Sequence, residues 1–333
     1  MISIICPIYN EEKYISSCIE SILGQDYPKD DLEVLFVDGM STDKTRSIIR
    51  KYIQDYPFIQ LLDNLSRVVP PAMNIGIRRA LGEIIIRLDA HAIYPPNYFS
   101  VLVKQLDALK ADNVGGVCQT LPVKKTTICK AIATALSSSF GMGNSYFRVG
   151  AREVMQVDTV PFGCFRKELF DKIGYFDEEL VRNQDDEFNG RIIKYGGKIF
   201  LLPSLVIKYY ARDTITKVRK MFYQYGLFKP LVNKKLGSPA TTRQFFPLLF
   251  VLGLILGLGL SFIHPVIAYS YISVLLFYIL LAFLFGFKDS KDLKQTLILP
   301  WIFFMIHVSY GWGYLTGLYK ITFHKSFTAK VNR

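Results

Sequence analysis

Three long apolar stretches near the C-terminus constrain this 333-residue chain more than any other feature. Residues 245–263, 266–287 and 295–319 contain no Lys, Arg, Asp or Glu. A helix of about 20 apolar residues is long enough to cross the hydrocarbon core of a bilayer. None of the three stretches has the polar face of a soluble helix. The sequence therefore predicts a transmembrane helical region, with about three spans, over residues 245–319.

The positive charge of the chain, +12 overall, is concentrated beside this region. Residues 1–207 carry 24 basic and 25 acidic side chains, whereas residues 208–244 carry nine basic and one acidic. Basic residues next to membrane spans are typical of the cytoplasmic side, where anionic lipids attract them. We therefore expect residues 208–244 to be a basic amphipathic juxtamembrane segment on an anionic membrane, not a surface for nucleic acid. Residues 320–333 form a basic tail.

The same pattern predicts how the chain is placed in the cell. The apolar run Ile2–Ile8 is too short for a signal peptide or an anchor, so we expect residues 1–207 in the cytoplasm and a multi-pass protein of the inner (cytoplasmic) membrane. Three full crossings would put the basic tail outside, against the positive-inside rule. Either the stretch 295–319 crosses nevertheless, which is the preferred interpretation, or it re-enters and returns.

Strand and helix patterns alternate in the first part of the chain. Short apolar, β-branched runs at residues 2–6, 32–37, 59–62 and 84–88 are separated by helical patterns. This order is typical of the α/β class, with a mostly parallel sheet that has helices on both faces. Ligands bind such sheets beyond the carboxyl ends of the strands. Because the chain has no glycine-rich phosphate loop, we expect carboxylates and a metal ion to hold any nucleotide there.

Asp89 and His91 follow one of these strands. Alternation along an extended chain points both side chains to the same side, where they are able to share a divalent cation that binds a diphosphate. The alternative is that Asp89 caps the next turn and His91 is merely solvated.

A second acidic cluster, Asp185-Asp186-Glu187, precedes a helical pattern. Acids at a helix N-terminus are favoured by the helix dipole, so the cluster has a structural explanation. The functional alternative is that one of them is a general base whose pKa is set by the like charges beside it.

Taken together, these motifs resemble those of family 2 glycosyltransferases, which have the GT-A fold. The matching motifs are Pro7-Ile8-Tyr9-Asn10-Glu11-Glu12, Val37-Asp38-Gly39, Asn74-Ile75-Gly76, Leu88-Asp89-Ala90-His91 and Gln184-Asp185-Asp186-Glu187-Phe188. The resemblance covers roughly residues 1–207. With the basic segment and the apolar tail, the chain is similar to membrane-anchored exopolysaccharide glycosyltransferases of the succinoglycan-biosynthesis type.

The resemblance implies a function and a set of residues. It implies an inverting enzyme that moves a sugar from a nucleotide-sugar, with a UDP-sugar expected, to a lipid-linked saccharide in the synthesis of an extracellular or cell-surface polysaccharide. It also implies a divalent cation, Mn²⁺ or Mg²⁺. The implied residues are Asp185 as the base, Pro7, Tyr9, Glu11, Asp38, Asn74 and Asp89 for the nucleotide-sugar, and Asp89 and His91 for the metal.

Two other functions remain as alternatives. A polyprenyl-phosphate glycosyltransferase has a phosphate acceptor and needs no base. A non-catalytic nucleotide-binding membrane protein is disfavoured, because a transport pathway requires polar groups that the apolar stretches lack.

Overall fold

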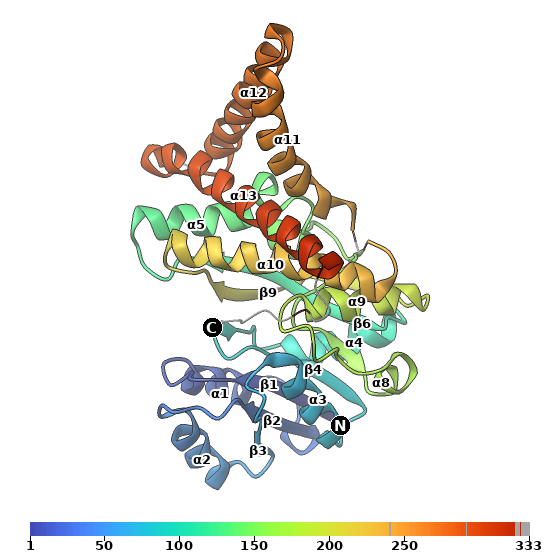
Figure 1. Ribbon diagram of the computed structural model, residues 1–333. Helices are drawn as coiled ribbons and strands as arrows, with labels where there is room; N and C mark the ends of the chain where they lie inside the picture. The colour runs from blue at the N-terminus through green and yellow to red at the C-terminus, as the bar shows by residue number, and fades with distance from the viewer. Residues whose placement is uncertain (240, 291, 324–326, 328–333) are drawn as a thin grey trace. The chain divides into compact units, whose positions relative to one another are not determined.

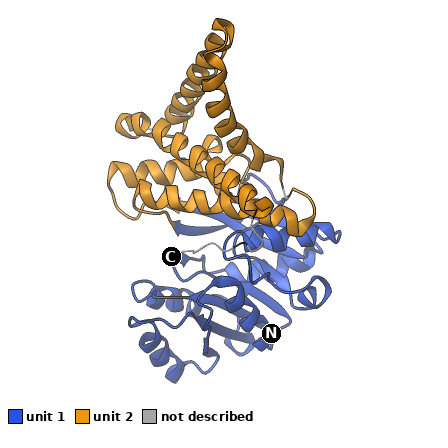
Figure 2. Cartoon of the chain, in the orientation of Figure 1, with its two compact units in different colours: residues 1–119, 150–209 blue, residues 120–149, 210–333 orange. Residues whose placement is uncertain are grey.

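The computed structural model describes residues 1–239, 241–290, 292–323 and 327 (Figure 1). The chain forms two compact units (Figure 2). Unit 1 consists of residues 1–119 and 150–209, and unit 2 of residues 120–149 and 210–333.

Unit 1 is built on a sheet that has nine strands within the described residues. The strands are β1 (Ile2–Ile8), β2 (Leu32–Asp38), β3 (Ile59–Asp63), β4 (Ile84–Arg87), β5 (Ala92–Ile93), β6 (Asn113–Leu121), β7 (Met155–Gln156), β8 (Cys164–Arg166) and β9 (Ile199–Tyr210). Their order is β3-β2-β1-β4-β8-β6-β9-β5, and β7 pairs with β9. The helices of this unit are α1 (Ile15–Leu23), η1 (Lys29–Asp31), α2 (Thr45–Asp55), α3 (Val69–Arg79), α4 (Tyr98–Ala108), α8 (Glu168–Ile173) and α9 (Gln184–Lys194).

The first half of the sheet is parallel, as the alternating pattern predicts. Strands β3, β2, β1 and β4 run in the same direction, whereas β8 is antiparallel to both β4 and β6, and β9 is antiparallel to β5 and β7. The sheet is therefore mixed. Helix α3 packs on β1 and β2, and Gly76 allows the close approach, since a Cβ there would lie 2.5 Å from a methyl carbon of Ile5.

Unit 2 is helical. Its elements are α5 (Thr127–Ser137), α6 (Ser139–Met142), α7 (Tyr146–Val149), α10 (Ile215–Leu236), η2 (Thr242–Gln244), α11 (Phe245–Ser261), α12 (Pro265–Asp289) and α13 (Leu293–Phe323). The sequence places residues 120–149 in the catalytic domain, but in the structure α5 and α6 pack on α13. Ala131, Ala135 and Phe303 belong to one buried apolar cluster there, which explains why this segment leaves unit 1.

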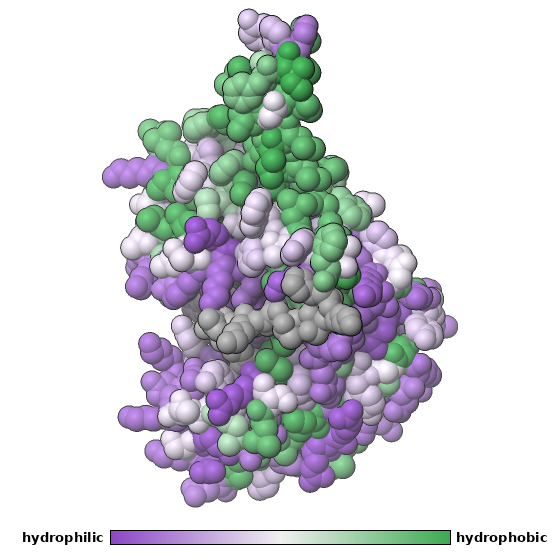
Figure 3. Space-filling view, viewed as in Figure 1, coloured by the Kyte–Doolittle hydropathy of each residue, from purple (hydrophilic) through white to green (hydrophobic). Residues whose placement is uncertain are grey.

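Three described helices are long and apolar enough to cross a membrane, and they cover the three predicted stretches. They are Thr242–Ser261, Pro265–Asp289 and Leu293–Phe323. The predicted turn at His264-Pro265 separates the first two, and the His264 side chain accepts a hydrogen bond from the backbone N–H of Val266. Apolar side chains cover the exposed surface of α11 and α12 (Figure 3), among them Leu256, Ile272 and Phe277.

The third helix differs from the other two in its packing. In α13, 44% of an apolar 18-residue segment is buried within the protein. The corresponding segments of the first two helices are 17% and 6% buried. Its small residues pack directly on α10. A Cβ at Gly313 would overlap the carbonyl oxygen of Tyr223, and one at Gly317 would overlap that of Leu227.

Candidate active site

The candidate site of unit 1 lies where three parallel strands end. Asp38, the last residue of β2, is the neighbour of Ile8 at the end of β1. On the other side of β1, Arg87 at the end of β4 is the neighbour of Ile5, and Asp89 follows two residues later. The sheet topology thus brings Asp38 and Asp89 to the same edge, as the sequence predicts.

Asp38 is fully buried, and its carboxylate is held from several directions. Arg46 forms an ion pair with it at 2.6 Å, and the Ser41 backbone N–H donates to it at 3.0 Å. The Ser41 hydroxyl also donates to it. A buried charge is tolerated when it is paired and hydrogen-bonded in this way. The orientation of Asp38 is therefore fixed.

The loop after β1 is tied to the loop after β2 by hydrogen bonds. The Asn10 N–H donates to the Ser41 hydroxyl at 2.8 Å, and the Asn10 side-chain oxygen accepts from the Thr42 N–H at 2.9 Å. Asn10 has a φ of 55°, a left-handed conformation that Asn tolerates better than most residues. The Glu11 N–H donates to the Thr45 hydroxyl at 2.8 Å. These bonds hold the Glu11 backbone in place.

Pro7 and Tyr9 lie at the same edge. Pro7 is a half-buried residue of β1 and pairs with Val37. The Tyr9 ring packs beside Gly39, where an added Cβ would lie 3.2 Å from the ring carbon Cδ2. Gly39 therefore leaves room for the ring, which is a large flat surface next to Asp38.

Asp89 and His91 face each other, with Asp89 Oδ1 2.8 Å from His91 Nδ1. Glu11 Oε1 lies 3.4 Å from the same nitrogen. Burial alone would raise the pKa of Asp89, but the charge and hydrogen bonds of His91 lower it to about 2. Burial likewise opposes the charged form of His91, yet Asp89 and Glu11 raise its pKa to about 11. The two carboxylates thus favour the protonated form of His91.

This arrangement bears on the predicted metal. The described residues contain no group of three or more His, Cys, Asp or Glu side chains that could hold a metal ion. Mg²⁺ and similar cations at nucleotide sites are often held by one or two carboxylates together with the phosphates of the substrate. Asp89 fits that requirement. His91 fits it only after losing the proton that it shares with Asp89.

Asp185 lies at the start of α9, in the first helical turn. The residue before the helix, Asn183, has a left-handed backbone with a φ of 60°. Asp185 forms an ion pair with Arg87, whose side chain is 10% exposed, while that of Asp185 is 36% exposed. Burial and the charge of Asp186 raise the pKa of Asp185, and Arg87 opposes them; the net direction is upward. Asp185 is therefore a partly exposed carboxylate whose pKa lies above that of an ordinary aspartate.

The other acids of this turn are placed differently. Glu187 is buried and accepts two hydrogen bonds from Arg191, at 2.6 and 2.9 Å. Arg191 also donates to the carbonyl oxygens of Ile173 and Tyr175. Glu187 thus fixes the segment before α9, whereas Asp185 contacts Arg87 at the end of β4.

Asn74, which the resemblance implies as a donor-binding residue, is hydrogen-bonded to the segment before α9. Its side-chain nitrogen donates to the Phe176 carbonyl at 2.9 Å and to Glu178 at 2.8 Å, and its oxygen accepts from the Phe176 N–H at 3.0 Å. The side chain is buried and both of its polar atoms are engaged. Asn74 thus holds residues 176–178 in place, and its part in binding the nucleotide-sugar stays a prediction.

Comparison with known proteins decides the family. The profile described as "Glycosyl transferase family 2" matches residues 3–174. A transferase of Methanococcus voltae is 30% identical over 96% of this chain and 97% of its own length. Its name is dolichyl N-acetyl-alpha-D-glucosaminyl phosphate 3-beta-D-2,3-diacetamido-2,3-dideoxy-beta-D-glucuronosyltransferase. The chain belongs to glycosyl transferase family 2.

Other relatives agree with this membership. The succinoglycan biosynthesis protein ExoA of Rhizobium meliloti (strain 1021) is 32% identical over 74% of this family 2 chain and 74% of its own length. Among solved structures, the mannosyltransferase PcManGT of Pyrobaculum calidifontis in complex with GDP-Man and Mn²⁺ superposes with a TM-score of 0.58. It has 19% identity, over 98% of this chain and 88% of that one. At that identity the likeness shows the GT-A fold.

Sequence reasoning on this family 2 glycosyltransferase missed residues that complete the site. Arg87 binds Asp185, the Tyr94 hydroxyl accepts from the Asp89 N–H at 2.7 Å, and the Tyr209 ring lies 5.8 Å from that of His91. Arg87 had a detectable signal: it is a lone cation in an apolar strand, two residues before Asp89, and alternation places both on one side. Tyr209 lies more than a hundred residues after His91 in the sequence, and no local sequence pattern marks it.

Proposed function

We propose that this inverting glycosyltransferase moves one sugar from a nucleotide-sugar, with a UDP-sugar as the expected donor, to a lipid-linked saccharide at the cytoplasmic face of the inner membrane. The product would serve the synthesis of an extracellular or cell-surface polysaccharide. The observation that carries this proposal is the contact of Asp185 with Arg87, because it brings a basic carboxylate next to the strand end that bears Asp89.

Asp185 is proposed as the general base. The acceptor hydroxyl must lose its proton as its oxygen attacks the anomeric carbon, and a carboxylate within hydrogen-bond reach takes that proton. Arg87 holds the carboxylate, and the raised pKa of Asp185 makes it a better proton acceptor. A single displacement of this kind inverts the configuration at the anomeric carbon.

The donor is proposed to bind at the strand ends. Pro7, Tyr9 and Glu11 would surround the base and ribose, and the fixed carboxylate of Asp38 would accept hydrogen bonds from the base edge. Asp89, with His91 as a second ligand, would hold Mn²⁺ or Mg²⁺ together with the diphosphate. The cation supplies Lewis-acid stabilisation of the departing nucleoside diphosphate.

The acceptor assignment is supported by the relatives and by the apolar helices. The printed name of the M. voltae relative describes transfer to a dolichyl-linked sugar phosphate, which is a lipid-linked saccharide. An enzyme with such an acceptor has to work at a membrane, and α11 and α12 expose apolar surface suited to one. This favours a saccharide hydroxyl as the acceptor over polyprenyl phosphate itself.

One assay tests the proposal directly. Membranes that contain the protein are incubated with radiolabelled UDP-, GDP- and dTDP-sugars, and transfer to the lipid extract is measured. We expect one donor to label a lipid-linked product. Absence of transfer from every donor, with lipid extract of the source cells supplied as acceptor, would contradict the proposed function.

Chelation tests the proposed metal. We expect activity to disappear in excess EDTA and to return on addition of Mn²⁺ or Mg²⁺, because the Asp89 carboxylate is negatively charged and needs a bridging cation to hold a diphosphate. The variant His91→Asp should shift the preference from Mn²⁺ toward Mg²⁺, since imidazole suits the softer ion better than carboxylate does. Full activity in EDTA would show that the diphosphate is held without a cation.

A further inference from the structure

The backbone of Asp89 lies just beyond the point where the sheet supplies hydrogen-bond partners. Strand β4 ends at Arg87, and the Leu88 N–H still donates to the Ile5 carbonyl oxygen of β1 at 2.9 Å. One residue later, the acceptor for the Asp89 N–H is a side chain, the hydroxyl of Tyr94, at 2.7 Å. The same hydroxyl donates to the Asp89 carbonyl oxygen at 3.4 Å. A single hydroxyl group therefore engages both backbone polar groups of Asp89.

The ring of Tyr94 is packed inside unit 1. The residue is 5% exposed, and the centre of its ring lies 4.8 Å from that of Tyr98 and 6.1 Å from that of Phe162. Pro95 follows Tyr94, and a residue before proline is disfavoured from the helical backbone conformation. The ring thus has little freedom to move, so its hydroxyl stays beside the Asp89 backbone.

The segment that carries Tyr94 is fixed by Gln25, which follows α1. The Gln25 side-chain nitrogen donates to the Pro95 carbonyl oxygen at 2.9 Å. Its side-chain oxygen accepts from the N–H groups of Tyr98 and Phe99, at 3.0 and 3.2 Å. A buried polar side chain that is bonded at both ends adds rigidity to the elements that it joins. Tyr94 therefore extends from a segment that is anchored to the end of α1.

The Asp89 side chain is held separately from its backbone. Its Oδ1 atom accepts from the His91 N–H at 3.2 Å and lies 2.8 Å from His91 Nδ1. These contacts engage one carboxylate oxygen and leave Oδ2 to meet a cation. A cation that is held by one carboxylate and the phosphates of a substrate has few protein ligands, so the position of that carboxylate decides how well it binds.

We propose that Tyr94 is a positioning residue for the nucleotide-sugar: its hydroxyl holds the Asp89 backbone so that the carboxylate stands where the cation and the diphosphate bind. The inference rests on the proposed role of Asp89 in donor binding. Tyr94 acts through Asp89 and is not itself a ligand. Without the hydroxyl, the Asp89 N–H loses its partner and the residue is free to change its backbone conformation.

The first test is nucleotide binding by the full-length protein in detergent. UDP, GDP and dTDP are each titrated with Mn²⁺ present, and binding is measured by calorimetry. Tyr94→Phe keeps the ring and removes the hydroxyl. We expect the Kd of the nucleotide that binds the wild type to rise about tenfold, as for the loss of one buried hydrogen bond, and half-maximal binding to require more Mn²⁺.

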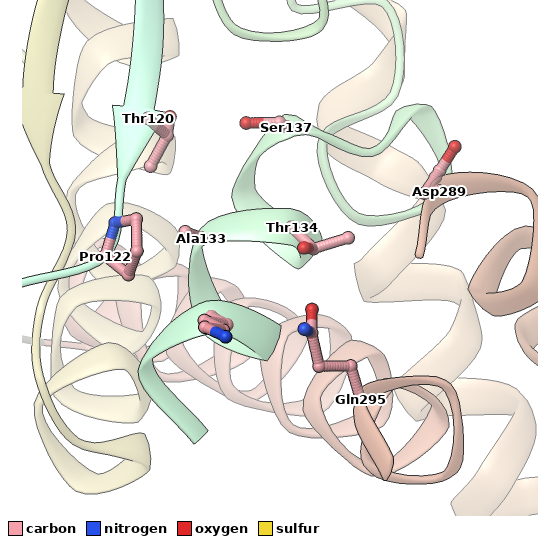
Figure 4. Close-up of a pocket in the computed structure, with 8 residues that line it drawn as sticks. Thr120, Pro122, Ala133, Thr134, Ser137, Asp289 and Gln295 are labelled. Carbon is pink, nitrogen blue, oxygen red and sulfur yellow. The ribbon is translucent and has the colours of Figure 1, made fainter. Parts of the chain in front are cut away.

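Tyr98→Phe is the matched control. It also removes the hydroxyl of a buried tyrosine, but that hydroxyl donates to the Phe162 carbonyl oxygen, at 3.3 Å. Nucleotide affinity and Mn²⁺ requirement should therefore stay at the wild-type values. A second control lies in unit 2, where Thr134 lines a surface hollow (Figure 4). Thr134→Ala should likewise bind as the wild type does.

The second test needs no ligand, because it follows amide hydrogen exchange of a peptide that contains Asp89. We expect the Asp89 amide to exchange slowly in the wild type, since its N–H is hydrogen-bonded, and faster in Tyr94→Phe. Exchange in Tyr98→Phe should match the wild type. The wild-type measurement alone remains informative where Tyr94→Phe fails to fold.

Specific outcomes overturn the positioning role. Equal nucleotide affinity of the Tyr94→Phe and Tyr98→Phe proteins would do so, and so would fast exchange of the Asp89 amide in the wild type. Weaker binding by Tyr94→Phe with unchanged exchange at Asp89 would show that the hydroxyl does not act through Asp89. Absence of binding of all three nucleotides to the wild type would contradict the proposed function itself, and the positioning role with it.

Discussion

Asp185, the proposed general base, would have to accept a proton while it stays paired with Arg87. We expect Asp185→Asn to lower the turnover number by ~10²–10⁴-fold, the usual contribution of a general base. Binding of the nucleotide-sugar should change little, because the amide keeps the size of the side chain. Asp186→Asn, in the same helical turn, should lose far less activity. Turnover of the Asp185→Asn protein above half that of the wild type would refute the assignment.

The pairing with Arg87 also predicts a pH dependence. A general base works only when deprotonated, so turnover falls as the pH drops through the pKa of Asp185. Arg87 lowers that pKa against burial and Asp186. In Arg87→Gln the pKa should rise, and the acid limb of the turnover–pH profile should move to higher pH.

Two further variants separate this electrostatic effect from a general loss of structure. Arg87→Lys keeps the charge and should restore the limb toward its original position. Arg166→Gln removes a surface ion pair with Asp107 and should leave the profile unchanged. An Arg87→Gln profile that drops uniformly, with no shift of the limb, would count against the role of Arg87.

The residues of the site were only partly predictable. Asp38 and Asp89 were proposed because polar residues after apolar strands mark the sheet edge, and Asp185 because it belongs to an acidic cluster at a helix start that matches the family motif. The sequence could not separate Asp185 from Glu187, since that choice depends on which faces Arg87 and which faces Arg191. Asn74 was assigned to the donor from the resemblance, and its contacts with Phe176 and Glu178 could not be predicted, because these residues lie about a hundred positions away.

At the scale of elements, the contact of α10 with α13 relies on glycine. Gly313→Val should destabilise the protein by ~1–3 kcal/mol, the usual cost of overpacking, because its side chain would overlap the Tyr223 carbonyl. Gly253→Val in α11 is the matched control, since an added Cβ there meets nothing within 4 Å. Thermal unfolding in detergent should show a lower midpoint for Gly313→Val alone. Equal unfolding midpoints for the two variants would mean that the packing of α13 on α10 contributes nothing to the free energy of unfolding.

Elements with a local signal were predicted, and those that depend on distant pairing were not. The parallel strands β1, β2, β3 and β4 and the three apolar helices have strong periodicity or length. The antiparallel strands β7 and β8 have two and three residues, too few for a pattern to show. The packing of α5 on α13 could not be foreseen either, because an apolar helix of eleven residues fits a soluble core equally well.

At the scale of the whole molecule, the packing of α13 bears on how the chain sits in a membrane. The sequence favours three crossings, with re-entry of the third stretch as the alternative. In the structure, α13 packs along α10, with Gly313 and Gly317 against Tyr223 and Leu227. Helix α10 carries Lys220, Lys229 and Lys234, so even the stretch from Lys220 to Lys234 is only about 20 Å long, shorter than the ~30 Å hydrocarbon core, and it contains a lysine. A helix held against α10 is therefore kept out of that core.

We accordingly expect α11 and α12 to form a hairpin across the bilayer and α13 to lie along its cytoplasmic surface. This places Lys320 in the cytoplasm, as the positive-inside rule prefers. The remaining basic residues of the tail, from Lys325 on, lie outside the described part of the chain. The test uses Phe323→Cys, at the exposed end of α13, in a background without the five native cysteines.

The expected result is protection of Cys at position 323 from an impermeant thiol reagent in intact cells, and labelling in inside-out vesicles. His264→Cys, in the turn between α11 and α12, is the control and should react in intact cells. Reaction at position 323 in intact cells would instead support three crossings, and would mean that α10 and α13 separate in the membrane. Protection at both positions would contradict the hairpin itself, because then the turn between α11 and α12 does not reach the outer surface.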